Sequence, residues 1–345
     1  MEENIVEQEN VMALLVKSVP LVILIAKYQL KQRKLNMKIL GMGNAIVDVI
    51  CKVDDSFLTK NNLTKSTMKL IDEVEFKKLL SILKIERTVS GGSVANSIVG
   101  LAQLGNKVGF IGKVNEDDLG KKYEEGLRKE KVEYFYSKKK EKLSTGTCLI
   151  LITPDSERTM CTFLGIAGKI NENDVDVNTI KRSKITFLEG YLWDEGEPKK
   201  AFEKAIQNSN KVAMSLSDPF CVNRHKSHFL NLVKNKLDIT FANEQEILSL
   251  IDSKNFNEVI SFGKNLGKLV VITRGETGSV AIHKNDVVQC DAQKNLKIID
   301  LTGAGDLFAA GFLHGYINNL SLKKSLEKGT EMSSKIIQKI GARLS

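Results

Sequence analysis

The chain has 345 residues, of which 42% are hydrophobic and 27% charged, and these proportions exclude a disordered, collagen-like or disulfide-rich protein. Its net charge of +9 comes mostly from lysines spread along the chain, whereas base readers and phosphate clamps favour arginine. We therefore predict no nucleic-acid partner. The five cysteines lack a C-x-x-C spacing, which fits reduced thiols in a cytoplasmic protein and gives no zinc site.

The first 36 residues differ in character from the rest of the chain. An apolar stretch at residues 11–26 is interrupted by Lys17 and Pro20, so it is too short for the roughly 20 residues of a membrane span. It also lacks the basic start of a signal peptide. We predict an N-terminal extension over residues 1–36, with a weak interfacial helix as the alternative, and a folded domain over residues 37–345.

Short apolar runs rich in Val and Ile alternate with helical patterns from residue 37 onward. This alternation is typical of βαβ units, and it predicts an α/β fold with a central, mostly parallel sheet flanked by helices. The predicted strands cover residues 38–42, 108–111, 185–188, 212–216, 239–241, 269–273 and 298–300.

A different pattern appears at residues 147–163. Two apolar segments, 147–153 and 158–163, flank the turn-rich sequence Thr-Pro-Asp-Ser-Glu and predict a β-hairpin. Together with residues 46–53 and 66–71, the hairpin is expected to form a small antiparallel sheet beside the main domain.

A glycine-rich turn follows the last predicted strand. Residues 300–306, Asp-Leu-Thr-Gly-Ala-Gly-Asp, open an apolar helix, where small residues let backbone N–H groups approach an anion and the helix dipole favours negative charge. Asp306 could then accept the proton of a hydroxyl group that attacks phosphorus. An ordinary capped helix is the alternative, so the turn indicates phosphoryl transfer only together with other motifs.

Three further motifs lie near the ends of predicted strands, where open α/β sheets bind ligands. Asn243 and Glu246 could orient Mg²⁺ and its waters, or could simply cap a helix. The sequence Thr-Arg-Gly-Glu-Thr-Gly at 273–278 could approach nucleotide phosphates or form an ordinary turn. Gly-Gly-Ser-Val-Ala-Asn at 91–96 leads into an apolar helix.

In this order the motifs resemble those of the ribokinase and adenosine kinase family of small-molecule kinases, over about residues 37–342. The resemblance implies a ribokinase-like core with a β-sheet lid, and ATP- and Mg²⁺-dependent transfer of the γ-phosphoryl group to a primary hydroxyl. It assigns Asp306 as the base; Gly303, Ala304 and Gly305 as the anion hole; Asn243 and Glu246 as the Mg²⁺ motif; and Thr273, Gly275 and Gly278 as nucleotide contacts.

The resemblance also implies an acceptor pocket. Its residues would be Asn44, Asp48, Gly92, Ser93 and Asn96, and Arg158 would meet phosphate when the lid closes. Asp300 and Thr302 would lie at a monovalent-cation site for K⁺, although Leu301 departs from the family pattern between them.

The acceptor is expected to be a nucleoside of the adenosine type, because residues 145–148 and 91–93 resemble the adenosine kinase branch. Tyr191 and Trp193, at a strand end, could stack on a base or belong to the core. A ribose or fructose kinase is the first alternative, and a non-catalytic nucleoside or sugar sensor is the second. A dinucleotide-binding turn at residues 41–46 is disfavoured, because Ile46 occupies the third glycine position. We expect a monomer or homodimer that binds a small molecule and no membrane.

Overall fold

The computed structural model describes residues 37–136, 139–155, 157–193 and 196–344. The predicted N-terminal extension therefore lies outside the described residues. Within them, no helix combines the length and the apolar character needed to cross a bilayer.

Nine strands form the larger sheet, in the order β14-β13-β12-β11-β10-β9-β1-β5-β6. All pairs from β12 to β6 are parallel, and β13 and β14 add an antiparallel hairpin at one edge. The strand bounds are β1 Met37–Met42, β5 Val108–Ile111, β6 Glu133–Tyr134, β9 Ser183–Glu189, β10 Val212–Ser215, β11 Ile239–Asn243, β12 Leu269–Thr273, β13 Ser279–His283 and β14 Asp286–Cys290. This confirms the predicted ribokinase-like α/β fold.

Helices cover both faces of this sheet because successive strand residues point to opposite sides. Ile39 and Phe187 face one core and their neighbours Leu40 and Leu188 face the other. The first core is closed by α4 (Ser93–Gln103), α5 (Asp118–Lys129), α12 (Ala304–Ile317) and α13 (Leu322–Ile336). The second is closed by α6 (Val177–Lys181), α7 (Glu197–Asn208), α8 (Pro219–Arg224), α9 (Lys226–Asn235), α10 (Glu244–Leu250) and α11 (Phe256–Leu266).

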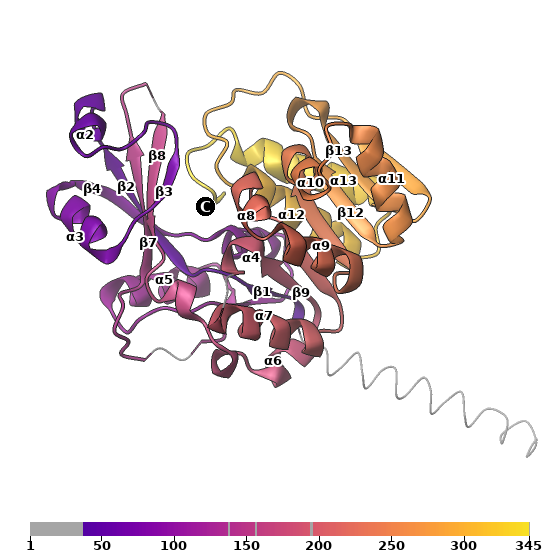
Figure 1. Ribbon diagram of the computed structural model, residues 1–345, viewed down its shortest axis with the longest axis horizontal. Coiled ribbons are helices and arrows are strands. Elements are labelled where there is room, and N and C mark those ends of the chain that lie inside the picture. Colours follow the sequence, from indigo (N-terminus) through magenta and orange to yellow (C-terminus); the bar gives the residue numbers. More distant parts are fainter. Residues whose placement is uncertain (1–36, 137–138, 156, 194–195, 345) are drawn as a thin grey trace, which may run out of the picture.

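The second, smaller sheet stands beside the large domain as a lid (Figure 1). Its order is β3-β8-β7-β2-β4, with bounds β2 Ile46–Lys52, β3 Met68–Leu70, β4 Ile85–Ser90, β7 Gly146–Ile152 and β8 Arg158–Phe163. The predicted lid segments are found, but the prediction of an antiparallel sheet was wrong, because β2–β7 and β3–β8 pair in parallel. The sequence prediction also missed β4.

The two faces of the lid have different surroundings, because successive residues of a strand point to opposite sides of the sheet. Val47 and Val49 share a core with Phe76 and Leu79, residues of α3 (Glu73–Ile82), while α2 (Asp55–Lys60) adds Leu58 to that core. Alternate residues of β2 point the other way, toward the large domain.

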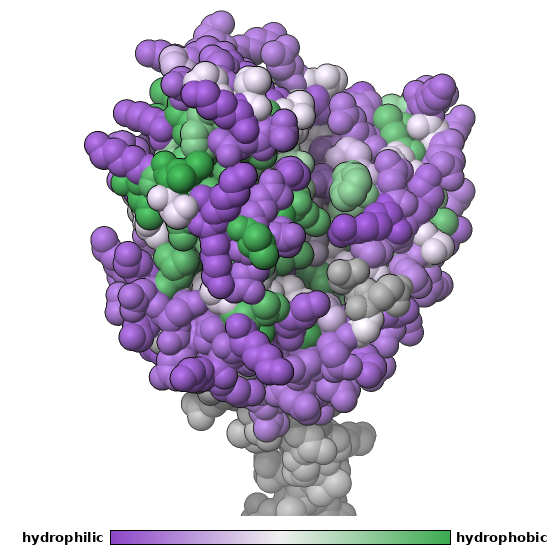
Figure 2. Space-filling model, turned by 60° about the vertical axis from the view of Figure 1, so that its left-hand side comes forward, coloured by the Kyte–Doolittle hydropathy of each residue, from purple (hydrophilic) through white to green (hydrophobic). Residues whose placement is uncertain are grey.

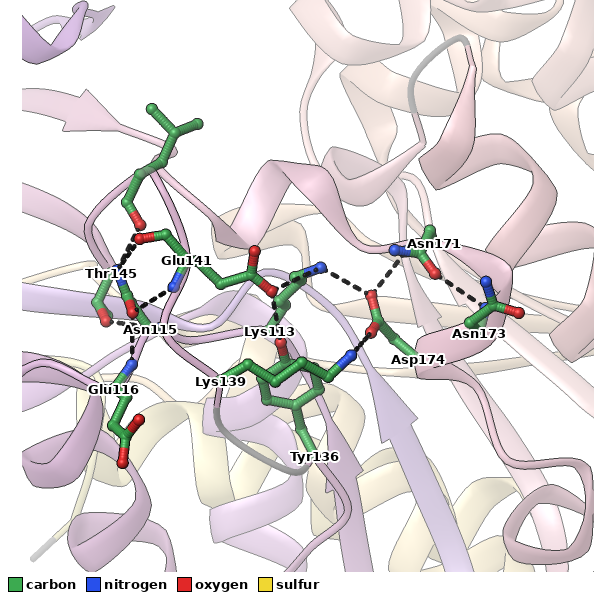
Figure 3. A network of polar contacts seen from close by, with 11 residues as sticks. Lys113, Asn115, Glu116, Tyr136, Lys139, Glu141, Thr145, Asn171, Asn173 and Asp174 are labelled. Atoms are coloured by element: carbon green, nitrogen blue, oxygen red, sulfur yellow. Dashed lines mark hydrogen bonds and ion pairs between the residues drawn. The ribbon is translucent and has the colours of Figure 1, made fainter.

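A buried polar network holds the lid at its root (Figure 3). Lys113, 5% exposed, follows β5 and pairs with Asp174 (3.1 Å) and Glu141 (3.3 Å). Asn115 donates its side-chain N–H to the carbonyl of Glu141 (3.1 Å), and its backbone N–H to Thr145 Oγ1 (3.0 Å). The network therefore fixes the chain just before β7 enters the lid.

One segment that was predicted as a strand of the large sheet, residues 298–300, is not a strand in the structure. Residues 298–300 form a loop, in which Ile298 and Ile299 are 55% and 46% exposed. The backbone N–H groups of Ile299 and Asp300 donate to the carbonyl of Ile337, at 2.8 and 3.1 Å. A short apolar run was thus mistaken for a strand, because its side chains lie on the surface and its backbone bonds to the end of α13 instead of to the sheet.

Candidate active site

A cavity of about 470 Å³ lies between the lid and the carboxyl ends of the large-sheet strands, and its size suits a small-molecule ligand. In the space-filling view, hydrophobic side chains show through an otherwise hydrophilic surface on the side where the lid comes forward (Figure 2). Most of the predicted site residues line this cavity: Asn44, Asp48, Gly92, Ser93, Asn96, Tyr191, Asn243, Glu246, Thr273, Thr302, Gly303, Ala304, Gly305 and Asp306.

The first turn of α12 presents unpaired backbone donors to the cavity. Gly303, at the N-cap, has a φ of +78°, which favours glycine, and no side chain caps the helix. In an α-helix the first N–H groups have no carbonyl partner, so those of Gly305 and Asp306 can bind an anion. No atom lies within 4 Å of the position that a side chain at Gly305 would take. This arrangement fits a phosphate group.

Asp306 is held on this turn by residues of α4. Ser93 Oγ donates to Asp306 Oδ1 (2.6 Å), and Asn96 Nδ2 donates to Oδ2 (3.0 Å). Burial in the cleft raises the pKa of Asp306 to about 6, although both hydrogen bonds oppose the increase. The carboxylate is therefore ionised at neutral pH and has a proton affinity suited to a general base.

Two more acidic side chains lie in the cavity. Asp48 belongs to β2 of the lid, and burial raises its pKa to about 7. Glu189, at the carboxyl end of β9, is 1% exposed, and burial raises its pKa to about 7 as well. The sequence prediction missed Glu189, because a single glutamate at a strand end has no distinguishing local pattern.

Glu189 holds two backbone segments of the acceptor pocket in place. Its two carboxylate oxygens accept the backbone N–H groups of Asn44 (3.1 Å) and Val94 (3.0 Å). Asn44 itself is 3% exposed, and its side-chain oxygen has no hydrogen-bond partner among the described residues. A buried acceptor without a partner is costly, so Asn44 is prepared to bind a ligand hydroxyl.

Asn243 and Glu246 form a capping box at the start of α10. Asn243 Oδ1 accepts the N–H of Glu246 (2.8 Å), and Glu246 Oε2 accepts the N–H of Asn243 (3.0 Å). Both residues also line the cavity, and Glu246 is only 5% exposed, so it is not a solvated cap. Burial raises the pKa of Glu246 to about 7, and a nearby cation would favour its charged form.

The predicted nucleotide turn lies only partly at the cavity. Thr273 lines it, whereas Gly275 and Gly278 belong to the turn between β12 and β13 and lie outside the cavity lining. The N–H of Arg274 donates to the carbonyl of Gly278 (2.8 Å). Gly278 has a φ of +95° and a neighbouring Cys290 carbonyl that leaves no room for a side chain, so the turn itself explains this glycine.

Arg158 and Asp300 form an ion pair of 2.8 Å between the lid and the anion-hole loop. Asp300 Oδ2 also accepts the N–H of Gly341 (2.6 Å), and Oδ1 accepts the N–H and hydroxyl of Thr302 (3.0 and 2.7 Å). Each carboxylate oxygen thus has two donors, and a guanidinium already neutralises the charge. These contacts do not fit the predicted monovalent-cation site at Asp300 and Thr302.

The two aromatic residues considered for base stacking, Tyr191 and Trp193, lie in different places: one at the cavity and one in the core. Tyr191 lines the cavity and donates its hydroxyl to the carbonyl of Ser217 (3.3 Å). Trp193 is 2% exposed and packs against Phe202 and Phe229, so of the two alternatives for this residue the structure shows the core one. The cavity instead contains Phe220, on α8, which is 63% exposed. Sequence alone does not distinguish such an exposed ring from a core aromatic.

Residues 65–345 match the sequence model of the pfkB family carbohydrate kinases. The chain belongs to this family. It is therefore a phosphotransferase that acts on a hydroxyl group, and membership implies ATP as the phosphoryl donor. The sensor alternative is set aside, because the family is enzymatic and the Asp306 turn is intact.

Solved kinase structures resemble the chain over most of its length. The adenosine kinase of Sinorhizobium meliloti has 36% identity and a TM-score of 0.82, covering 89% of this chain and 95% of that one. A probable sugar kinase of Rhizobium etli has 36% identity and a TM-score of 0.81, covering 89% and 94%. Among curated sequences, the 5-dehydro-2-deoxygluconokinase of Clostridium beijerinckii is 27% identical over 286 residues, which are 76% of this chain and 83% of the relative.

Proposed function

We propose that this kinase transfers the γ-phosphoryl group of ATP to the primary hydroxyl of a nucleoside of the adenosine type, with Asp306 as the general base. The observation that carries this proposal is the position of Asp306. Its carboxylate lies in the cavity at the uncapped start of α12, beside the N–H groups that can bind the transferring group.

The proposed reaction is a direct transfer. The acceptor oxygen forms a bond to the γ-phosphorus, the bond from that phosphorus to the β,γ-bridging oxygen breaks, and ADP leaves. Asp306 accepts the proton of the acceptor hydroxyl, and the N–H groups of Gly305 and Asp306 stabilise the charge on the transferring oxygens. Asn44, Asp48 and Asn96 would bind the other hydroxyls of the acceptor.

Magnesium would be held at the Asn243–Glu246 end of the cavity. Within the described residues, no three His, Cys, Asp or Glu side chains are grouped so that they could hold a metal directly. Asn243 and Glu246 would therefore act through water, as is common for Mg²⁺ bound with phosphates. The ion would neutralise negative charge on the nucleotide.

The cavity has an apolar wall that a plain sugar would not fill. The lid and its connections supply Ile46, Met68, Leu70, Met160 and Leu164, and Phe220 adds an exposed ring. Met68 and Leu70 are 39% and 43% exposed, so a flat base placed there would cover apolar surface. This wall favours a nucleoside over ribose or fructose.

The charges of the cavity also discriminate between acceptors. Its lining contains five acidic side chains, Asp48, Glu189, Asp218, Glu246 and Asp306, and a single basic one, Arg224. A gluconate-type acceptor would bring its carboxylate to the acceptor end, beside Asp48, Glu189 and Asp306, and repulsion disfavours it there. The phosphates of ATP would instead meet the N–H groups at the start of α12. The second candidate, a neutral-sugar kinase, is supported by the hydroxyl-binding end formed by Asn44, Asp48 and Asn96.

An acceptor screen tests the proposal. ADP formation would be followed with adenosine, ribose, fructose and 5-dehydro-2-deoxygluconate, and adenosine should have the highest kcat/KM. Asp306→Asn should fold normally and lose at least about a hundredfold in kcat. A higher kcat/KM for a free sugar would favour the second candidate, and a fully active Asp306→Asn variant would contradict the assignment of the base.

A further inference from the structure

The C-terminal segment, residues 340–344, follows α13 and runs along a small crevice beside the candidate active site. The chain turns at Gly341, which has a φ of +94°, and Ala342 packs against Gly303 so closely that a side chain at Gly303 would overlap it. In Figure 1 this end of the chain lies between the lid and the large domain. The segment therefore covers the anion-hole loop and reaches the base of the lid.

Arg343 is the residue of this segment that lies deepest. It is 8% exposed, and no other arginine of the described ranges is classed as buried. Its Nε donates to Asn96 Oδ1 (2.9 Å), and its Nη2 donates to the carbonyl of Gly91 (3.5 Å), where the lid joins α4. A buried charge needs such partners, and one of them, Asn96, belongs to the acceptor pocket.

The contact with Asn96 fixes which way the carboxamide points. Asn96 has one acceptor oxygen and one donor nitrogen on its side chain. Its oxygen faces the Arg343 guanidinium, so its nitrogen faces Asp306 Oδ2, at 3.0 Å. The opposite orientation would place the oxygen against a carboxylate and the nitrogen against a guanidinium, and both hydrogen bonds would be lost.

The charge of Arg343 also faces the carboxylates of the cavity. It lowers the pKa of Asp48 and of Asp306 and so opposes the effect of their burial. Asp306 raises the pKa of Asp48 and of Glu189, whereas Arg158, like Arg343, lowers that of Asp48. Arg343 therefore places a positive charge beside two neighbouring acids, Asp48 and Asp306.

We propose that Arg343 is a positioning residue for phosphoryl transfer: it orients the Asn96 carboxamide toward the Asp306 carboxylate and places a fixed positive charge beside Asp48 and Asp306. This inference rests on the proposed role of Asp306 as the base. It gives the C-terminal segment a part in the reaction, although residues 340–344 do not line the cavity.

The pH dependence of kcat in Arg343→Gln tests the proposal. Without the positive charge, the pKa of Asp306 rises, so a larger fraction of the base is protonated at low pH. Because the pKa of Asp306 is about 6, an upward shift of about one pH unit makes the loss of kcat roughly fivefold larger at pH 6 than at pH 8.5. Arg343→Lys, which keeps the charge, should restore the acid side of the profile. A merely structural role would lower kcat equally at both pH values.

Arg87→Gln is the matched control, because Arg87 lines the small crevice next to Arg343 but is exposed on β4; its profile should equal that of the wild type. Arg343→Gln should cost less in an Asn96→Ala background than in the wild type, because part of its action passes through Asn96. Additive losses, an unshifted profile, or an Arg87→Gln profile equal to that of Arg343→Gln would overturn the proposal.

Two further results separate this proposal from the proposed function. An active Asp306→Asn variant would contradict the base itself. An inactive Asp306→Asn variant, together with a pH-independent Arg343→Gln loss, would contradict the Arg343 proposal alone. Thermal denaturation shows whether Arg343→Gln folds. If Arg343→Gln does not fold, the double-mutant cycle is made with Arg343→Lys in the wild-type and Asn96→Ala backgrounds. Additive losses of kcat in that cycle count against the proposal.

Discussion

Asp48 shows how a single residue can be costly for the fold and useful for the site. Its pKa is raised to about 7 by burial in the folded protein, whereas an unfolded aspartate titrates near 3.9. Because the folded state binds this proton more tightly, ionisation of Asp48 costs stability as the pH rises from about 4 through 7. A buried carboxylate with a raised pKa is expected where the site needs a charged group to accept hydrogen bonds from substrate hydroxyls.

The Asp48→Asn variant should therefore bind its acceptor less well and unfold no more easily. Loss of charge-assisted hydrogen bonds to hydroxyls should raise KM roughly tenfold or more, while Tm at pH 8 should equal or exceed that of the wild type. Initial-rate kinetics and thermal denaturation measure the two effects. A lower Tm with an unchanged KM would show that Asp48 is structural.

Phe220 and Trp193 form a second residue-scale comparison. Phe220 is exposed in the cavity and Trp193 is buried in the core. Because base stacking contributes about 1 to 3 kcal/mol, Phe220→Ala should lower kcat/KM for adenosine by roughly 5- to 150-fold relative to ribose, with little change in Tm. Trp193→Ala should lower Tm without changing that ratio. Equal losses for both acceptors in Phe220→Ala would contradict stacking on this ring.

At the scale of elements, the lid depends on the polar network at its root (Figure 3). Lys113 and Asp174 have side chains that are 5% and 1% exposed, so each carries a charge that only its partners compensate. Lys139 contacts the same carboxylate at 3.7 Å, but its side chain is 59% exposed. The two lysines therefore offer a matched pair of substitutions.

Lys113→Met should lower the free energy of unfolding by about 3 to 5 kcal/mol, because it leaves Asp174 buried without its main partner. Lys139→Met should cost at most about 1 kcal/mol, as expected for an exposed pair. Urea denaturation measures both values, and adding Asp174→Asn to Lys113→Met should recover part of the loss. Similar costs for the two lysine variants would show that burial of the pair is unimportant.

At the scale of the whole molecule, the sequence predicted the parts whose signal is local. Six large-sheet strands, β1, β5 and β9 to β12, were predicted because strands buried on both faces read as continuous apolar runs, whereas β6, β13 and β14 were missed. Strand β4 escaped prediction because its residues are mostly polar and its first three are exposed. Arg343 and Glu189 were missed for a different reason. Their contacts with Asn96 and Asn44 span 247 and 145 residues, and no local pattern records such a distance.

The last prediction concerns the boundary of the fold. The described structure begins with β1, which pairs with β5 and β9 in the middle of the large sheet, and the sheet needs no residue before Met37 to complete these pairs. A chain that starts at Met37 should keep the Tm and kcat of the 345-residue chain.

A chain that starts at Gly41 is the control. It should fail to fold, because it lacks Ile39 and Leu40, which are fully buried on opposite faces. Circular dichroism and the ADP assay compare the three chains. Loss of activity or of Tm in the Met37 chain would show that residues 1–36 contribute to the fold or the site.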